Sequence, residues 1–120
     1  MKKMLVYVFA DVNTNLDVFK NVIANKAGVS VEYETNEEKF IAALTAQRFD
    51  LLILDLDVAK GDYKKAQMMA EMIYPGAAVT ELDMQHADFI GFKIDDLLRK
   101  WADANTESEI KFFDNPNLGL

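Results

Sequence analysis

The sequence contains no cysteine, and only two prolines and five glycines occur among its 120 residues. The absence of cysteine excludes disulfides, zinc–thiolate sites and catalysis by a thiol nucleophile. No apolar run approaches the roughly 20 residues that a membrane span requires. We therefore expect a chain that depends on a packed hydrophobic core for its stability.

Positive charge is also scarce, because 13 Lys and Arg face 20 Asp and Glu, which gives a net charge of −7. This charge repels phosphate backbones and anionic lipid headgroups, so neither nucleic acid nor a membrane surface is an expected partner. The opening segment MKKMLVYVFADV begins like a secretory signal, but its apolar run stops at Asp11 without a small-residue cleavage pattern. We expect a first strand here and a cytoplasmic protein.

Hydrophobic residues make up 51% of the chain, enough for one core, so residues 1–120 are predicted to form a single domain. Apolar runs and alternation predict five strands, at residues 4–10, 29–34, 51–54, 77–83 and 109–113. The run at 29–34 alternates like an edge strand, whereas the runs at 4–10 and 51–54 are continuous, as in buried parallel strands.

Helical spacing predicts a helix between each pair of strands. Gly28 is placed to end the first helix, and Thr35 with Glu38 matches a capping box at the start of the second. Gly61 and Asp62 are expected to open the third helix, with an inner face of Ala66, Met69, Met72 and Ile73. Strands that alternate with helices indicate an α/β fold, a parallel sheet covered on both faces.

Residues 86–105 allow two interpretations. Ile90, Ile94 and Trp101 recur at helical spacing, which favours one long helix followed by the strand at 109–113. Alternatively, FIGFKI (89–94) is the fifth strand and DDLLRKWADAN (95–105) is the last helix. The alternative leaves about six residues between parallel strands, whereas a crossover needs about a dozen, so we favour the long helix.

Acidic residues follow the predicted strands at their carboxyl ends: Asp11, Asp55, Asp57, Asp83 and Asp114. Ligands of open α/β sheets bind at this edge, and converging carboxylates attract hard divalent cations such as Mg²⁺. Aspartate is also common in loops because its side chain caps turns and helices. For Asp11 and Asp55, which follow the two central strands, a metal-binding role and a structural role are equally expected.

The segment FDLLILDLDVAKGD, residues 49–62, resembles the third strand of response-regulator receiver domains. The resemblance implies that Asp55 is the phosphoacceptor and that the Asp57 carbonyl binds magnesium. It further implies a pocket that includes Asp11, Asp83 and Thr80, the last in place of the family's Ser or Thr after strand four. It covers residues 4 to about 83 and implies a flavodoxin-like α/β/α sandwich with strand order 2-1-3-4-5.

The chain departs from the receiver pattern at two places. Ala10 precedes Asp11 where receivers have two adjacent acids, and Asn115-Pro116 stands where they have Lys-Pro. Without that lysine a phosphoryl group would lack its cationic partner. We therefore expect an atypical or pseudo-receiver, a signalling or regulatory protein-interaction module without enzymatic activity. The alternative is a working receiver, phosphorylated on Asp55, with magnesium held by Asp11 and Asp55.

A second resemblance concerns LLILDLDVA, which is similar to the first motif of haloacid-dehalogenase-type phosphatases. It implies a small phosphohydrolase in which Asp55 is the nucleophile and Asp57 the general acid. Ala59 stands where that motif has threonine, so we rank this interpretation third.

The predicted fifth strand is followed by too few residues for the helix that completes a receiver. One sheet face near strands four and five would then be bare and would present Ile110 or Phe112. Exposed apolar patches commonly mark interfaces. We therefore expect a homodimer or a protein partner at this face, with the tail and Phe112 or Phe113 in the contact.

Overall fold

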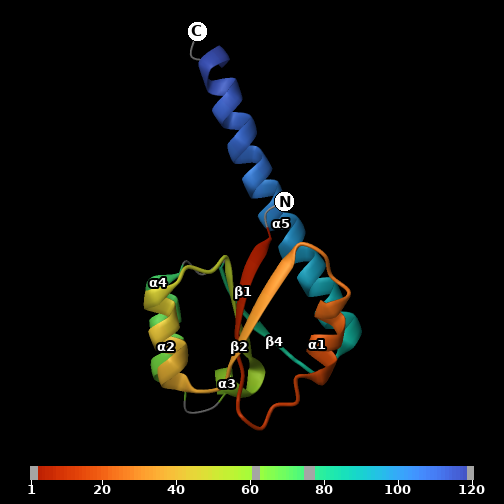
Figure 1. Cartoon of the computed structure of the whole chain (residues 1–120), viewed down its shortest axis with the longest axis vertical. Helices are drawn as coiled ribbons and strands as arrows, with labels where there is room; N and C mark the ends of the chain where they lie inside the picture. Colours follow the sequence, from red (N-terminus) through yellow and green to blue (C-terminus); the bar gives the residue numbers. More distant parts are fainter. Residues whose placement is uncertain (1–2, 61–62, 75–77, 119–120) are drawn as a thin grey trace.

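The computed structural model describes residues 3–60, 63–74 and 78–118, with side chains as far as residue 104 except those of residues 59 and 60. Its parallel sheet has the order β2-β1-β3-β4. The strands are β1 (Met4–Phe9), β2 (Val29–Glu34), β3 (Leu51–Asp55) and β4 (Val79–Leu82). One face carries α1 (Asp17–Ala24) and α5 (Ala87–Leu118); the other carries α2 (Glu37–Ala46), α3 (Leu56–Lys60) and α4 (Lys64–Ile73) (Figure 1). This three-layer α/β architecture is consistent with a flavodoxin-like fold.

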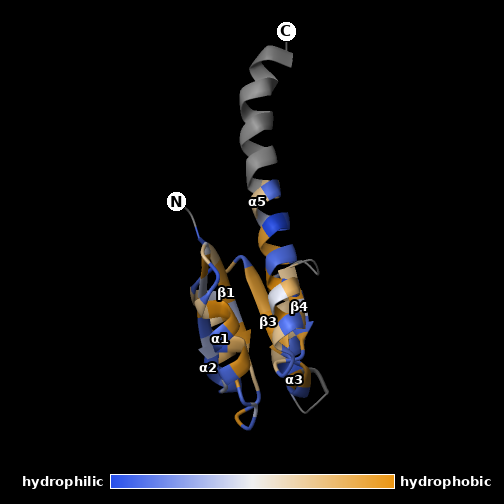
Figure 2. Cartoon of the chain, turned by 90° about the vertical axis from the view of Figure 1, so that its right-hand side faces the viewer, coloured by the Kyte–Doolittle hydropathy of each residue, from blue (hydrophilic) through white to orange (hydrophobic). Residues whose placement is uncertain are grey.

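All residues of the central strands β1 and β3 except Leu5 are buried, as their continuous apolar sequences predicted. Figure 2 colours the chain by hydropathy and shows β3 as hydrophobic. Successive side chains of a strand point to opposite faces, so each strand contributes to two cores. Val6 and Val8 pack toward α1 and α5, whereas Tyr7 and Phe9 pack toward α2 and α4. The prediction that 29–34 forms an edge strand is confirmed, since β2 pairs with β1 alone.

The core beneath α2 and α4 is aromatic. Phe40 of α2 stacks on Phe9 with ring centroids 4.5 Å apart, and Tyr7 stacks on Phe49 at the same separation. The start of α4 is held by Glu37, whose carboxylate accepts a hydrogen bond from the Ala66 N–H at 3.1 Å. These contacts hold α4 against α2 on one side of the sheet.

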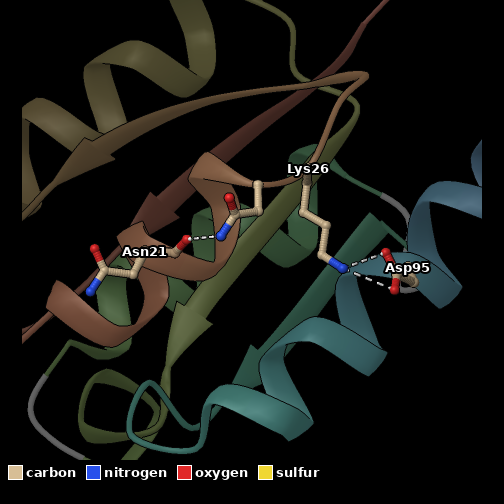
Figure 3. Close-up of polar contacts among 4 residues, drawn as sticks. Asn21, Lys26 and Asp95 are labelled. Carbon is tan, nitrogen blue, oxygen red and sulfur yellow. Dashed lines mark hydrogen bonds and ion pairs between the residues drawn. The ribbon is translucent and has the colours of Figure 1, made fainter.

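The core beneath α1 and α5 is mainly aliphatic, with Phe19, Ile90 and Ile94 fully buried. An ion pair between Lys26 Nζ and Asp95 Oδ1, 2.9 Å long, joins the end of α1 to α5 (Figure 3). The two helices thus pack side by side on the face opposite α2 and α4.

Helix α5 confirms the long-helix interpretation and contradicts the strand at 89–94. It also continues to Leu118, so the predicted strand at 109–113 is wrong and the described sheet has four strands rather than five. Neither glycine nor proline occurs between Gly91 and Pro116. Extending a helix adds one hydrogen bond per residue, whereas a new strand must first find a partner. No described helix has the length and apolarity needed to cross a membrane.

The extension of α5 removes the basis of the interface predicted near strands four and five. The side chains of Ile110, Phe112 and Phe113 lie outside the described residues, but their backbone belongs to a helix and not to a sheet edge. Helix α5 packs on the sheet face expected to be bare and then projects beyond the amino ends of the strands (Figure 1). The molecule is consequently elongated, measuring 57 × 30 × 21 Å.

Three local predictions also need correction. Asn36, not Thr35, caps α2, because its side chain accepts the Lys39 N–H at 2.9 Å. Met72 and Ile73 do not lie on the inner face of α4, since they are 73% and 36% exposed. The short helix α3 was not predicted. Gly61 and Asp62, expected to open α4, lie outside the described residues.

Gly28 does not end α1, because α1 ends at Ala24 with Asn25 as its C-cap. Gly28 instead directly precedes β2, and it provides a stability prediction. It has a φ of +82°, and its carbonyl accepts the Met4 N–H at 2.8 Å as β2 begins. An added Cβ would lie 3.9 Å from the nearest atoms of Leu98, so space is sufficient and only the backbone conformation is unfavourable. We expect Gly28→Ala to lower the free energy of unfolding by about 1–2 kcal/mol in urea denaturation.

Gly91→Ala is the matched control for Gly28→Ala. Gly91 lies inside α5 and does not have a positive φ, and a Cβ added at Gly91 would be 3.7 Å from Val22. This variant should be about 0.5–1 kcal/mol more stable, because alanine loses less entropy in a helix. Equal effects of the two substitutions would contradict the role assigned to Gly28.

Candidate functional site at the carboxyl edge of the sheet

The carboxyl ends of β1 and β3 lie side by side, with Phe9 opposite Leu54. Asp55 is the last residue of β3, and Asp11 follows the end of β1. The Asp55 residue is only 2% exposed, the one buried charged or polar residue of the described chain. The central strands thus bring the two predicted site residues together.

Both carboxylate oxygens of Asp55 accept hydrogen bonds from this chain. Oδ2 accepts the Asp11 N–H at 3.1 Å and the Thr14 hydroxyl, and Oδ1 accepts the Asp57 N–H at 3.1 Å. The last bond caps the first turn of α3 in the manner of an N-cap. Asp55 therefore joins the loop after β1 to the loop after β3.

Asp11 is also held by neighbouring donors. Its Oδ1 accepts the Tyr63 hydroxyl at 2.7 Å, and its Oδ2 accepts the Asn13 N–H at 3.0 Å. The Tyr63 and Asn13 hydrogen bonds lower the pKa of Asp11, and donation to Asp11 raises the pKa of Tyr63. The Tyr63 ring also packs edge-on against Phe9 with centroids 5.2 Å apart. Tyr63 thus anchors the start of α4 to the loop after β1.

Asp57 lies at the same edge but faces solvent. Its Oδ2 is 3.3 Å from the Thr14 hydroxyl, which makes its closer contact with Asp55. The Thr14 hydroxyl therefore lies between Asp55 and Asp57, and the Thr14 N–H donates to the Asp11 carbonyl at 2.9 Å.

Thr80 and Asp83 do not join this group. Thr80 pairs with Ile53, and it is Leu82 that pairs with Asp55, so Thr80 lies two residues back from the edge. Asp83 instead accepts the Gln85 N–H at 2.9 Å and lies 3.4 Å from His86. Asp83 thus stabilises the turn that enters α5. The Asp114 side chain lies outside the described residues.

No described lysine, arginine or histidine forms an ion pair with the carboxylates of Asp11, Asp55 or Asp57. Within the described ranges, no three acidic or histidine side chains are grouped closely enough to hold a metal ion. Magnesium at Asp11 and Asp55 stays a prediction, and it would have to share these carboxylate oxygens with the hydrogen-bond donors that now contact them.

Two residues of this edge, Thr14 and Tyr63, were not predicted from sequence. Thr14 lies 41 positions from Asp55, and Tyr63 lies 52 positions from Asp11. No short motif contains either pair. A hydroxyl residue in the loop after the first strand is a weak signal that could have identified Thr14.

No protein family, curated protein or solved structure matches the chain. The functional assignment therefore depends on the geometry of this edge and on the resemblance carried by residues 49–62.

Proposed function

We propose that this protein is a receiver-like regulatory module that binds other proteins, in which Asp55 is a structural residue and not a phosphoacceptor. The parallel order β2-β1-β3-β4 and the aspartate at the end of β3 agree with the receiver-like interpretation. The burial of Asp55, with both oxygens hydrogen-bonded within the chain, supports a structural role.

A phosphoacceptor carboxylate must present a lone pair to an incoming phosphorus atom. The three hydrogen bonds occupy three of the roughly four lone-pair positions of the Asp55 carboxylate, so one position on Oδ1 remains, and the residue is only 2% exposed. The phosphoryl group would carry about −1.5 to −2 charges in place of the single negative charge of the Asp55 carboxylate, beside Asp11 and Asp57. Since no described cation contacts these residues, that charge would be poorly compensated.

Beryllofluoride with magnesium, which mimics an acyl phosphate, tests the structural role of Asp55. We expect the amide NMR spectrum to show no shifts that depend on Asp55, and we expect no Asp55-dependent hydrolysis of an aryl phosphate. Asp55→Asn is the control in both measurements. Large shifts at Thr14 and Asp57 that disappear in this variant would favour the phosphorylatable receiver. Turnover lost in both Asp55→Asn and Asp57→Asn would favour the Asp-x-Asp phosphohydrolase.

A further inference from the structure

A pocket lies at the amino end of the sheet, which is the end opposite Asp55. Its volume is about 270 Å³, and its apolar walls are Met4, Leu51, Ala78, Leu97 and Trp101. Met4 and Leu51 are the buried first residues of the central strands β1 and β3. Leu97 and Trp101 come from α5, close to where this helix projects beyond the sheet (Figure 1). The pocket is therefore built mainly by the central strands and the helix packed on them.

The size and lining of this pocket suit a small organic molecule. An apolar cavity of about 150 Å³ holds one benzene molecule, so a volume of about 270 Å³ has room for about ten non-hydrogen atoms. Water is a poor occupant of such a space, because each molecule needs several polar partners. Apolar walls with a few polar groups at the edge are the usual form of a small-molecule site.

Two charged residues, Asp50 and Lys100, complete the lining of the pocket. The Lys100 ammonium lies 3.0 Å from the Asp96 carboxylate, so its charge is balanced within α5. Asp50 accepts the Leu5 N–H at 2.8 Å, but no lysine, arginine or histidine in the described part of the chain forms an ion pair with it. The pocket thus presents an uncompensated negative charge beside apolar walls.

We propose that this pocket binds a small organic ammonium ion, a primary amine that carries an apolar aromatic body. The ammonium group pairs with Asp50, and the aromatic body lies against Met4, Leu51 and Trp101. This proposal goes beyond the proposed regulatory function and does not depend on any chemistry at Asp55.

The charges of the chain favour an amine over a neutral or anionic molecule of the same shape. A neutral ligand would take water from the Asp50 carboxylate without supplying a partner, and an anionic ligand would be repelled by it. Indole rings such as that of Trp101 also attract cations through their π electrons. The net charge of −7 further raises the concentration of cations near the protein.

Three probes that share one phenyl ring test the selectivity of the pocket: phenethylamine, phenethyl alcohol and phenylacetate. Trp101 is the only tryptophan in the sequence, so its fluorescence reports binding at this position. We expect saturable binding of phenethylamine, at least about fivefold tighter than that of phenethyl alcohol, with phenylacetate the weakest.

Each other result of the probe titration would overturn the proposal. Tighter binding of phenylacetate would assign recognition to Lys100, and equal binding of the amine and the alcohol would exclude a role for the ammonium group. No saturable change with phenethylamine up to about 10 mM, where even a modest ligand of this size would bind, would exclude the site.

Asp50→Asn tests the charge while keeping an oxygen that can accept the Leu5 N–H. This variant should bind phenethylamine at least about fivefold more weakly and phenethyl alcohol as well as wild type does. Asp88→Asn is the matched control, because Asp88 is exposed in the first turn of α5 and does not line the pocket. An equal loss in Asp88→Asn would mean that only the net charge attracts the amine, which would overturn the proposal.

Ala78→Leu tests the location, because its larger side chain would occupy part of the pocket. It should weaken the binding of both phenethylamine and phenethyl alcohol, and urea denaturation of the same sample would verify that the variant is folded. Ala46→Leu, the same change at an exposed position of α2, should leave both affinities unchanged. Full affinity in Ala78→Leu, or an equal loss in Ala46→Leu, would place the probes elsewhere and overturn the proposal.

Discussion

Replacing Phe40 with alanine is expected to lower the free energy of unfolding by about 3–5 kcal/mol. Phe40 is fully buried, stacks on Phe9 at 4.5 Å and contacts the Tyr7 ring at a centroid distance of 5.2 Å. Its removal leaves a cavity between α2 and β1, and the neighbouring rings are held by further aromatic contacts that limit collapse. Urea denaturation monitored by circular dichroism would measure the loss.

Phe89→Ala is the matched control, because it removes the same side chain from a position that is half exposed. We expect a change within about 0.5 kcal/mol for this variant. A loss for Phe40→Ala below about 1 kcal/mol would contradict the aromatic core.

Replacing Asp55 with alanine is expected to destabilise the fold by about 2–3 kcal/mol. The substitution leaves the Asp11 N–H, the Thr14 hydroxyl and the Asp57 N–H without their common acceptor. It also removes the cap of α3 and the link between the loops after β1 and β3. Part of this loss of stability is offset, because folding of the variant does not move the charged Asp55 carboxylate from water into the protein interior.

Two variants accompany this measurement. Asp57→Ala removes an exposed carboxylate from the same edge and should change stability by less than about 0.5 kcal/mol. Asp55→Asn should lose about 1–2 kcal/mol, because its amide nitrogen would face one of the donors. A catalytic carboxylate commonly destabilises its fold, so its removal raises stability. If the Asp55→Ala variant were more stable than wild type, this result would contradict the structural role of Asp55 and favour its role as a phosphoacceptor.

The sequence by itself determined the elements whose signals are local. The continuous apolar runs of β1 and β3 predicted central strands, because both faces of such strands are buried. The alternation of residues 29–34 predicted the edge strand β2, and helical periodicity predicted α5 through residue 105 despite Gly91. The sequence carries this information because apolar residues that share one face recur about every 3.6 residues in a helix and every two residues in a strand. The alternation of strands and helices predicted a parallel sheet, and it therefore predicted that Asp11 and Asp55 lie at the same edge of that sheet.

Only the tertiary structure decided which groups donate hydrogen bonds to Asp55 and where α5 ends. The partners of Asp55 include residues 41 and 44 positions away, and no local pattern indicates that their donors meet its carboxylate. Thr80 lies back from the edge because the pairing register of β3 and β4 places Leu82 beside Asp55, and register depends on packing across strands. Residues 109–113 have the composition of a strand, but a strand forms only where a neighbour offers hydrogen bonds, whereas α5 already offered them within its own chain.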